Sequence, residues 1–281
     1  MPRPLLSNAV IKNIAYLTML VDHFFAVVFS AIIRQYSAAG YETDRLQQVY
    51  SAGRAVGRIS FVLFAYLTVE GFIHTRSKSK YLLRLGLFAL VSEVPFDLTF
   101  TGQMIDLNSQ NIFFTLFISV LVLTVWEWAA ENLRMLRRTK ARRDLYWNVC
   151  VGVFRAVQVG IVLLGCAAAH FLRTDYRYMG VLLIVTFYMI HDKPWLFKIV
   201  PAACVMLFGM WGINCQRYAG IYTTSYLFRF SMRELYGLFA FVPIALYDGT
   251  KGKQLPKAVC YGFYPVHLLV LCGIARVISL G

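Results

Sequence analysis

Two histidines and an aspartate lie inside long apolar runs of the sequence. Asp22 and His23 are adjacent in LTMLVDHFFAVV, and His267 lies in GFYPVHLLVL. A charge at the centre of a membrane helix costs roughly 2.5 to 3.5 kcal/mol, so each such group needs a partner or a role. Because imidazole titrates at about pH 6.5, His23 is a candidate general base for proton transfer at neutral pH.

The two histidines, His23 and His267, are expected to share one site. His23 and His267 fall at about the same depth of their apolar runs. Adjacent residues of a helix point about 100° apart, so Asp22 is not expected to bond directly to His23. His170 and His191 lie at the ends of apolar runs, and we expect them to be hydrated residues without a catalytic role.

A second set of ionisable residues lies in the next two apolar runs. Arg58, Glu70 and His74 occur in GRISFVLFAYLTVEGFIHTR, and Glu93 and Asp97 occur in YLLRLGLFALVSEVPFDLTF. Glu70 and His74 are one helical turn apart, so Glu70 could orient His74. Glu93 and Asp97 share a helix face in the same way, and Arg58 is their expected partner. Such an ion pair could serve catalysis, or it could simply lock two helices together.

The elements that must position these residues are membrane-spanning helices. Of the 281 residues, 59% are hydrophobic and 15% are charged, whereas roughly a quarter of a soluble domain is charged. No segment alternates with the period of two that barrel strands need, so an all-α, polytopic transmembrane bundle is predicted. About nine spans (eight to ten) are expected in a single integral membrane domain over residues 1–281. The predicted spans are 9–33, 52–74, 81–100, 110–130, 148–172, 178–191, 194–213, 233–248 and 258–279.

Basic residues follow every second predicted span. Cytoplasmic loops of membrane proteins carry an excess of Lys and Arg, so this pattern predicts a cytoplasmic N-terminus and an external C-terminus. The formal charge of +14 therefore indicates topology within membrane lipid, and no nucleic-acid partner is predicted. The basic residues are Arg76, Lys78, Lys80 and Arg84, then Arg134, Arg137, Arg138, Lys140, Arg142 and Arg143, then Lys193 and Lys198, and finally Lys251, Lys253 and Lys257.

Neither a disulfide framework nor a metal site is predicted. The six cysteines form no CxxC pair, and most lie in apolar segments where a thiol behaves as a small hydrophobe. The histidines are scattered, without the spacing of metal ligands.

Several long blocks of the sequence resemble the TraX family. These membrane acetyltransferases are named for the protein that acetylates the N-terminus of the conjugative F-type pilin. The strongest block runs from GRISFVLFAYLTVEGFIHTRSKSKYLLRLGLFALVSEVPFDLTF into QNIFFTLF, and IKNIAYLTMLVDHFF, DYRYMGVLLIVTFY and YDGTKGKQLPKAVCYGFYPVHLLVL resemble further blocks. The chain departs from the pattern at Asp248, where Asn is expected, and at Phe24, where Ile is commoner.

The resemblance implies acetyl transfer in the bacterial cytoplasmic (inner) membrane. The donor would be cytoplasmic acetyl-CoA or another acyl-CoA, and the acceptor an amine or hydroxyl of a protein such as a pilin, a lipid or a glycan. His23 would be the general base, an acidic residue would hold its imidazole, and a further cationic or histidine side chain would stabilise the oxyanion. The candidate acids are Asp22, Glu93 and Asp97, and the candidates for the oxyanion are Arg58 and His267.

Coenzyme A carries several phosphates, so a basic cluster is its expected binding site. The segment after the second span supplies Arg76, Lys78, Lys80 and Arg84, and Glu70 and His74 precede it. We expect these six residues to contact the cofactor, although the same basic residues also fit plain positive-inside bias.

Two other classes of function fit parts of the sequence. Intramembrane acids and histidines also build proton-coupled transporters and flippases, but paired, interrupted spans in two matching halves are not apparent. A non-catalytic assembly factor for pili or the envelope would leave His23 and His267 without an evident use. The aromatic segment NCQRYAGIYTTSYLFRF matches no motif and could carry acceptor specificity.

Overall fold

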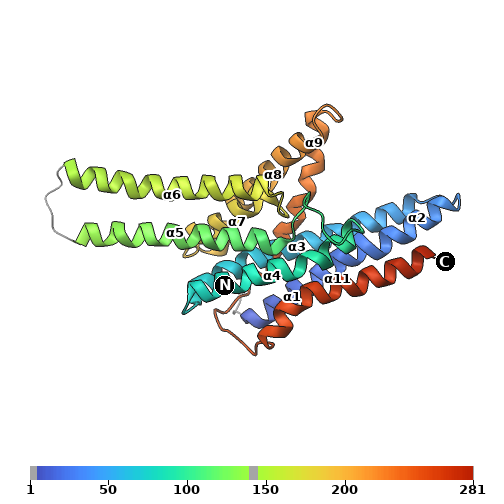
Figure 1. Cartoon of the computed structure of the whole chain (residues 1–281), viewed down its shortest axis with the longest axis horizontal. Coiled ribbons are helices and arrows are strands. Elements are labelled where there is room, and N and C mark those ends of the chain that lie inside the picture. The colour runs from blue at the N-terminus through green and yellow to red at the C-terminus, as the bar shows by residue number, and fades with distance from the viewer. Residues whose placement is uncertain (1–4, 139–144, 281) are drawn as a thin grey trace.

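The computed structural model of this chain describes residues 5–138 and 145–280. All regular elements in these residues are helical, and β-pairing is confined to two isolated bridges. Figure 1 shows the helices in order: α1 (Asn8–Phe24), the π-helical turn η1 (Phe25–Phe29), α2 (Ser30–Ala38), α3 (Asp44–His74), α4 (Lys78–Phe100), α5 (Ile112–Arg138), α6 (Leu145–Phe171), α7 (Arg177–Met189), α8 (Trp195–Arg217), α9 (Thr224–Ser231), the 3-10 helix η2 (Met232–Ala240), α10 (Phe241–Ala245) and α11 (Lys257–Leu280).

Six helical stretches of the described residues are long and apolar enough to cross a membrane. They are Asn8–Ala38, Asp44–His74, Ile112–Leu136, Leu145–Phe171, Trp195–Arg217 and Ala258–Leu280. The prediction of an all-helical membrane bundle is thus confirmed, whereas the predicted count of about nine spans is not. Helix α4 has 23 residues but carries Arg84, Glu93 and Asp97 in its interior, and α7 has only 13 residues.

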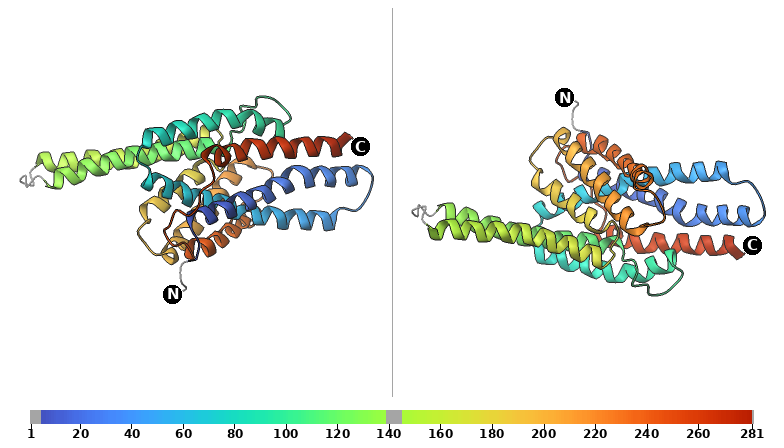
Figure 2. Two further views of the ribbon diagram at one scale, coloured as in Figure 1. Left: turned by 90° about the horizontal axis from the view of Figure 1, so that it is seen from below. Right: turned by 90° about the horizontal axis from the view of Figure 1, so that it is seen from above.

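Most of the helices run along one long axis and overlap around α3, whereas α8 and α9 lie at a steep angle to it (Figure 1). Helices α5 and α6 form an antiparallel pair that extends past the others at one end, while α2, the start of α3 and the end of α11 extend at the other (Figure 1). The turned views in Figure 2 show the same arrangement. In the most apolar 18-residue stretch of α3, 67% is buried inside the protein, against 11% for α6. Helix α3 is therefore the central helix, and α6 leaves most of its apolar surface to lipid.

The predicted basic segments lie toward one end of this bundle. The start of α4 and the chain between α10 and α11 lie on the side of the α5–α6 tips, and the turn from α2 to α3 lies on the opposite side (Figure 1). Lys140, Arg142 and Arg143 of the predicted basic loop fall outside the described residues. The shared end is what alternate basic loops of a membrane bundle require.

Helices α1 and α3 approach each other at two glycines. Gly53 and Gly57 are one helical turn apart on α3, and a Cβ at either would overlap the Phe25 ring or the Asp22 carboxylate. Small residues at this spacing allow close contact between membrane helices. The π-helical turn η1 begins two residues after His23, and such turns occur frequently at functional sites. The α1–α3 contact thus fixes Asp22 at the centre of the bundle.

Candidate functional site

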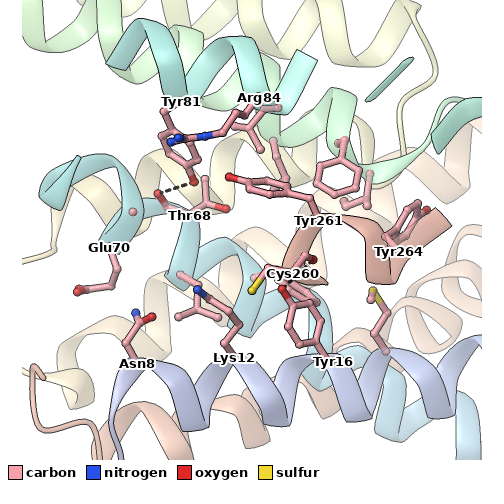
Figure 3. A pocket seen from close by; sticks show the side chains of 18 of the residues that line it. Asn8, Lys12, Tyr16, Thr68, Glu70, Tyr81, Arg84, Cys260, Tyr261 and Tyr264 are labelled. Atoms are coloured by element: carbon pink, nitrogen blue, oxygen red, sulfur yellow. Dashed lines mark hydrogen bonds between the residues drawn. The ribbon is translucent and has the colours of Figure 1, made fainter. Parts of the chain in front are cut away.

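A cavity of about 940 Å³ runs between α1, α3, α4 and α11. Its basic end is lined by side chains from the start of α1, the start of α4 and the loop before α11, and its inner end by residues from the middle of the bundle (Figure 3). The basic end contains Lys12, Arg76, Lys80, Arg84 and Lys251. The inner end contains Asp22, His23, Asp175, Tyr176 and Tyr264. One continuous space therefore joins a cluster of cations to the candidate base.

His23 and His267 form the pair that the sequence predicts. His23 Nδ1 lies 2.6 Å from His267 Nε2, and the two rings stack at 9° with centroids 4.9 Å apart. His23 lines the cavity, whereas His267 does not. The two imidazoles are therefore in direct contact, as expected, and His267 lies on the side of His23 away from the cavity.

The hydrogen bonds of this pair assign the tautomer of His23. His267 Nδ1 lies 2.7 Å from the carbonyl oxygen of Phe263, which can only accept, so Nδ1 of His267 carries a hydrogen. In the neutral pair, His267 Nε2 then accepts from His23 Nδ1–H. His23 Nε2 is left with a free lone pair, which is what a general base needs.

Asp22 is held by an arginine that the sequence reading did not single out. Arg54 Nη1 lies 2.7 Å from Asp22 Oδ2 and donates to the Asp22 carbonyl at 3.2 Å. As expected, Asp22 and His23 form no side-chain hydrogen bond with each other in the described part of the chain. The signal for Arg54 was present in GRAVGR, where two arginines directly follow the two closely packed glycines.

The predicted partner of Arg58 is wrong. Arg58 Nε lies 3.2 Å from Glu234 Oε1 of η2, and its guanidinium donates to the Tyr176 hydroxyl at 3.4 Å. Glu234 is buried, whereas Tyr176 is partly exposed and lines the cavity. Arg58 faces η2 and the α6–α7 loop because these segments pack against α3, and it therefore does not reach the two acids of α4.

Those two acids hold the loop between α4 and α5 instead. Glu93 accepts from the backbone and side-chain N–H groups of Asn111, and Asp97 accepts from the backbone of Asp106 at 2.7 Å. Neither carboxylate lines the cavity. Glu93 and Asp97 thus do not meet the His23 imidazole, and their contacts satisfy loop donors before α5.

Glu70 lies at the basic end of the cavity, where two histidines and a tyrosine surround its carboxylate. Its Oε1 lies 2.8 Å from His191 Nε2, and its Oε2 accepts from the Tyr247 hydroxyl at 3.3 Å. His74 Nδ1 lies 3.7 Å from Oε2 and 2.9 Å from the Glu70 carbonyl, to which it donates. Glu70 therefore does contact His74, as predicted.

His191 is not the hydrated end residue that the sequence suggests. The hydrogen bond to Glu70 raises the pKa of the His191 imidazole above its usual value. Its side chain is only 24% exposed. Sequence spacing could not reveal this partner, because His191 and Glu70 lie 121 positions apart.

The predicted cofactor-binding residues divide between the cavity and another helix. Arg76, Lys80 and Arg84 line the cavity, together with Glu70 and His74. Lys78 is absent from the lining and forms an ion pair with Glu127 of α5. Lys78 thus joins α4 to α5 instead of facing the cavity.

Three residues of the inner end, Asp175, Tyr176 and Tyr264, were missed by the sequence reading. Asp175 and Tyr176 belong to the short α6–α7 loop and line the cavity. Tyr176 has a left-handed backbone, with φ of 59°, and its ring stacks on Phe61 at 3.7 Å between centroids. A non-glycine residue in this conformation persists only where its surroundings hold it. The position of the loop beside Arg58 is therefore fixed by the core of the bundle.

Comparison with known proteins places these features in a family. A family model described as TraX protein matches residues 7–275. The probable fimbrial assembly protein FimC, serogroup H1, of Dichelobacter nodosus is 32% identical over 122 residues. This match covers 41% of the present chain and 44% of the relative, so it spans less than half of either protein. No solved structure matches the chain significantly.

Proposed function

Because the chain belongs to the TraX family, we propose that it is a membrane-embedded acyltransferase that moves an acetyl group from acetyl-CoA to an amine or hydroxyl acceptor. One observation supports this most directly. A single cavity leads from a cluster of cations to His23 in the middle of the bundle. Coenzyme A has the matching shape, with phosphates at one end and a thioester at the end of a long neutral arm.

His23 acts as the general base in this proposal. As the acceptor nitrogen or oxygen attacks the thioester carbonyl, Nε2 of His23 takes the proton from the attacking atom. The tetrahedral intermediate then collapses, the bond from carbon to sulfur breaks, and the imidazolium returns the proton to the departing thiolate. His267 holds His23 in the tautomer that has its lone pair on Nε2, as the third member of a triad does.

The oxyanion needs a donor that faces the cavity. Neither His267 nor Arg58 lines it, so the two sequence-based candidates are not retained for this role. Tyr264 lines the inner end, and its ring lies edge-on to His23 at 5.9 Å between centroids. We assign its hydroxyl as the hydrogen-bond donor to the developing oxyanion. Asp22 and Arg54 form an ion pair that joins α1 to α3 beside this site.

The acceptor is proposed to be a pilus or fimbrial subunit. The D. nodosus relative is described as a probable fimbrial assembly protein, and its similarity motivates a pilin-related role in the membrane. Intact-mass spectrometry of surface pilins from cells with and without this protein tests the assignment. A subunit lighter by one acetyl group in its absence is expected, and identical masses would direct the search to lipids or glycans.

The activity is tested with purified protein in nanodiscs and acetyl-CoA labelled on the acetyl group. Wild type should bind the label and release acetate slowly. His23→Ala should lower turnover by about 100-fold or more, as expected for loss of a general base. His170→Ala is the matched control, because His170 does not line the cavity. Folded wild-type protein that binds no acetyl-CoA would remove the proposal and favour a proton-coupled transporter.

A further inference from the structure

The loop between α10 and α11 forms one wall of the cavity at its basic end. Gly249, Lys251 and Gln254 of this loop line the cavity together with the basic residues at the start of α4. Lys12 extends from α1 on the same side as the loop, whereas Arg84 lies on the opposite wall (Figure 3). Two sets of cations thus border one opening.

The backbone of the loop is held in a defined shape. Gly249 and Gly252 have φ of 76° and 62°, a region that favours glycine. The N–H of Asn8 donates to the Thr250 carbonyl at 2.8 Å, and the N–H of Ala9 to that of Lys251 at 3.2 Å. A Cβ at Gly252 would overlap Ser7. The loop is therefore packed against the first turn of α1 and hydrogen-bonded to it.

Within residues 5–138 and 145–280, the cations on both walls lack acidic partners. Lys12 Nζ donates to the neutral amide of Gln254 at 2.7 Å, and Arg84 Nε is buried without a hydrogen-bond partner in the described residues. Among those residues, neither Lys12, Lys251 nor Arg84 forms an ion pair with a carboxylate. Lys12 and Arg84 are partly buried, and a partly buried cation without a counter-charge is unfavourable, so this end of the cavity is suited to an anionic ligand.

The separation of Lys12 from His23 along α1 indicates which phosphate group Lys12 binds. Lys12 and His23 are eleven residues apart on one continuous helix, which is about 16 Å at a rise of 1.5 Å per residue. An extended pantetheine arm has about this reach between its sulfur and the diphosphate. Arg76 and Lys80 at the start of α4 also line the cavity and are left for the ribose 3′-phosphate.

We propose that Lys12 and Lys251, the latter positioned by the loop between α10 and α11, form a diphosphate-binding subsite for a nucleoside diphosphate, and that Lys80 and Arg76 at the start of α4 receive the 3′-phosphate. This inference rests on the proposed function, because it assigns the two phosphate groups of coenzyme A to two separate walls. Lysine ammonium groups bind phosphate through charge-assisted hydrogen bonds.

The test uses full-length protein in nanodiscs, with coenzyme A, 3′-dephospho-coenzyme A and ADP as probes in equilibrium binding. Lys12→Gln and Lys251→Gln should each weaken all three ligands by about 10-fold or more, because each ligand contains the diphosphate. Lys80→Gln should weaken coenzyme A while leaving the 3′-dephospho form within about twofold. Lys253→Gln is the matched control, since Lys253 lies in the same loop but does not line the cavity.

Folding is checked by gel filtration and thermal unfolding, and Lys12→Arg should restore binding. Equal affinities for wild type, Lys12→Gln and Lys251→Gln would overturn the assignment. So would losses restricted to the ligand that carries the 3′-phosphate, or a wild-type protein that binds neither ADP nor coenzyme A. Lysine-dependent ADP binding without any acetyl transfer would leave the subsite standing and remove the proposed acyltransferase.

Discussion

His267 decides which nitrogen of His23 carries the proton. Its Nδ1–H is engaged by the Phe263 carbonyl at 2.7 Å, and its Nε2 lies 2.6 Å from His23 Nδ1. The Nδ1–H tautomer of His23 is favoured only if the side chain at position 267 has a hydrogen-bond acceptor where Nε2 of His267 lies. The role is one of positioning, because His267 does not line the cavity.

Replacement of His267 should therefore lower turnover without weakening donor binding. His267→Ala is expected to reduce kcat by at least about 10-fold with little change in the KM for acetyl-CoA, because His23 loses its orienting partner. His267→Gln places a carbonyl oxygen near the lost Nε2 and should recover part of kcat. Steady-state kinetics of both variants provides the measurement. Equal losses in the two variants would contradict the tautomer assignment.

His191 makes the stability of the basic end depend on pH. Its pKa is raised because the protonated imidazole gains the hydrogen bond to Glu70. The stabilisation is complete below the unfolded value of about 6.5 and is lost as the pH rises through the higher pKa of the folded state. The Tm of wild type should accordingly fall as the pH is raised above about 6.5.

Thermal unfolding across neutral pH in wild type and His191→Gln measures this effect. The variant should have a lower Tm at acidic pH and a weaker dependence on pH, because its side chain does not titrate. His74→Gln is the control, since the His74 side chain is 68% exposed and lies 3.7 Å from Glu70. Parallel pH profiles for wild type and His191→Gln would show that the pair adds no pH-dependent stability.

At the scale of elements, the contact between α1 and α3 depends on Gly57. Gly57→Ala should destabilise the protein by about 1 to 3 kcal/mol, because the new methyl group overlaps the Asp22 carboxylate and forces the helices apart. The same change should reduce acetyl transfer, since His23 follows Asp22 directly. Chemical or thermal unfolding in detergent gives the stability difference.

Gly160→Ala in α6 supplies the matched comparison. A Cβ at Gly160 meets nothing within 4 Å, and alanine favours a helix over glycine by up to about 1 kcal/mol. Gly160→Ala should therefore be neutral or stabilising. A Gly57→Ala variant as stable as Gly160→Ala would show that α1 and α3 do not need this close approach.

Local pattern was enough to locate the helices but not their partners. Each predicted span overlaps a helical segment, because apolar length is a property of neighbouring residues. The match of His23 with His267 followed from equal depth in two spans. The pairing of Arg58 with Glu234 could not be predicted, because it depends on how η2 packs against α3 after a separation of 176 positions. Asp175 was missed for a different reason. It lies in a loop between two predicted spans, and a loop residue cannot be assigned a depth in the membrane from the sequence.

At the scale of the whole molecule, the cavity and the loop charges require the same orientation. Acyl-CoA is a cytoplasmic metabolite in this proposal, so the basic end of the cavity must face the cytoplasm. Lys251 and Lys253 lie in the loop at that end, and Gln103 lies in the loop between α4 and α5, toward the opposite end of α4. The predicted topology places these two loops on opposite sides of the membrane.

Substituted-cysteine labelling tests this orientation in intact cells. Gln103→Cys should react with a membrane-impermeant maleimide added outside, because the predicted topology places the loop after α4 outside and Gln103 is exposed. Lys253→Cys should react above the wild-type cysteine background only after the membrane is permeabilised. The reverse labelling pattern would place the cations of the cavity outside the cell, away from acyl-CoA. In that case the same cavity would have to bind an external anion, and the acyltransferase proposal would fail together with the predicted topology.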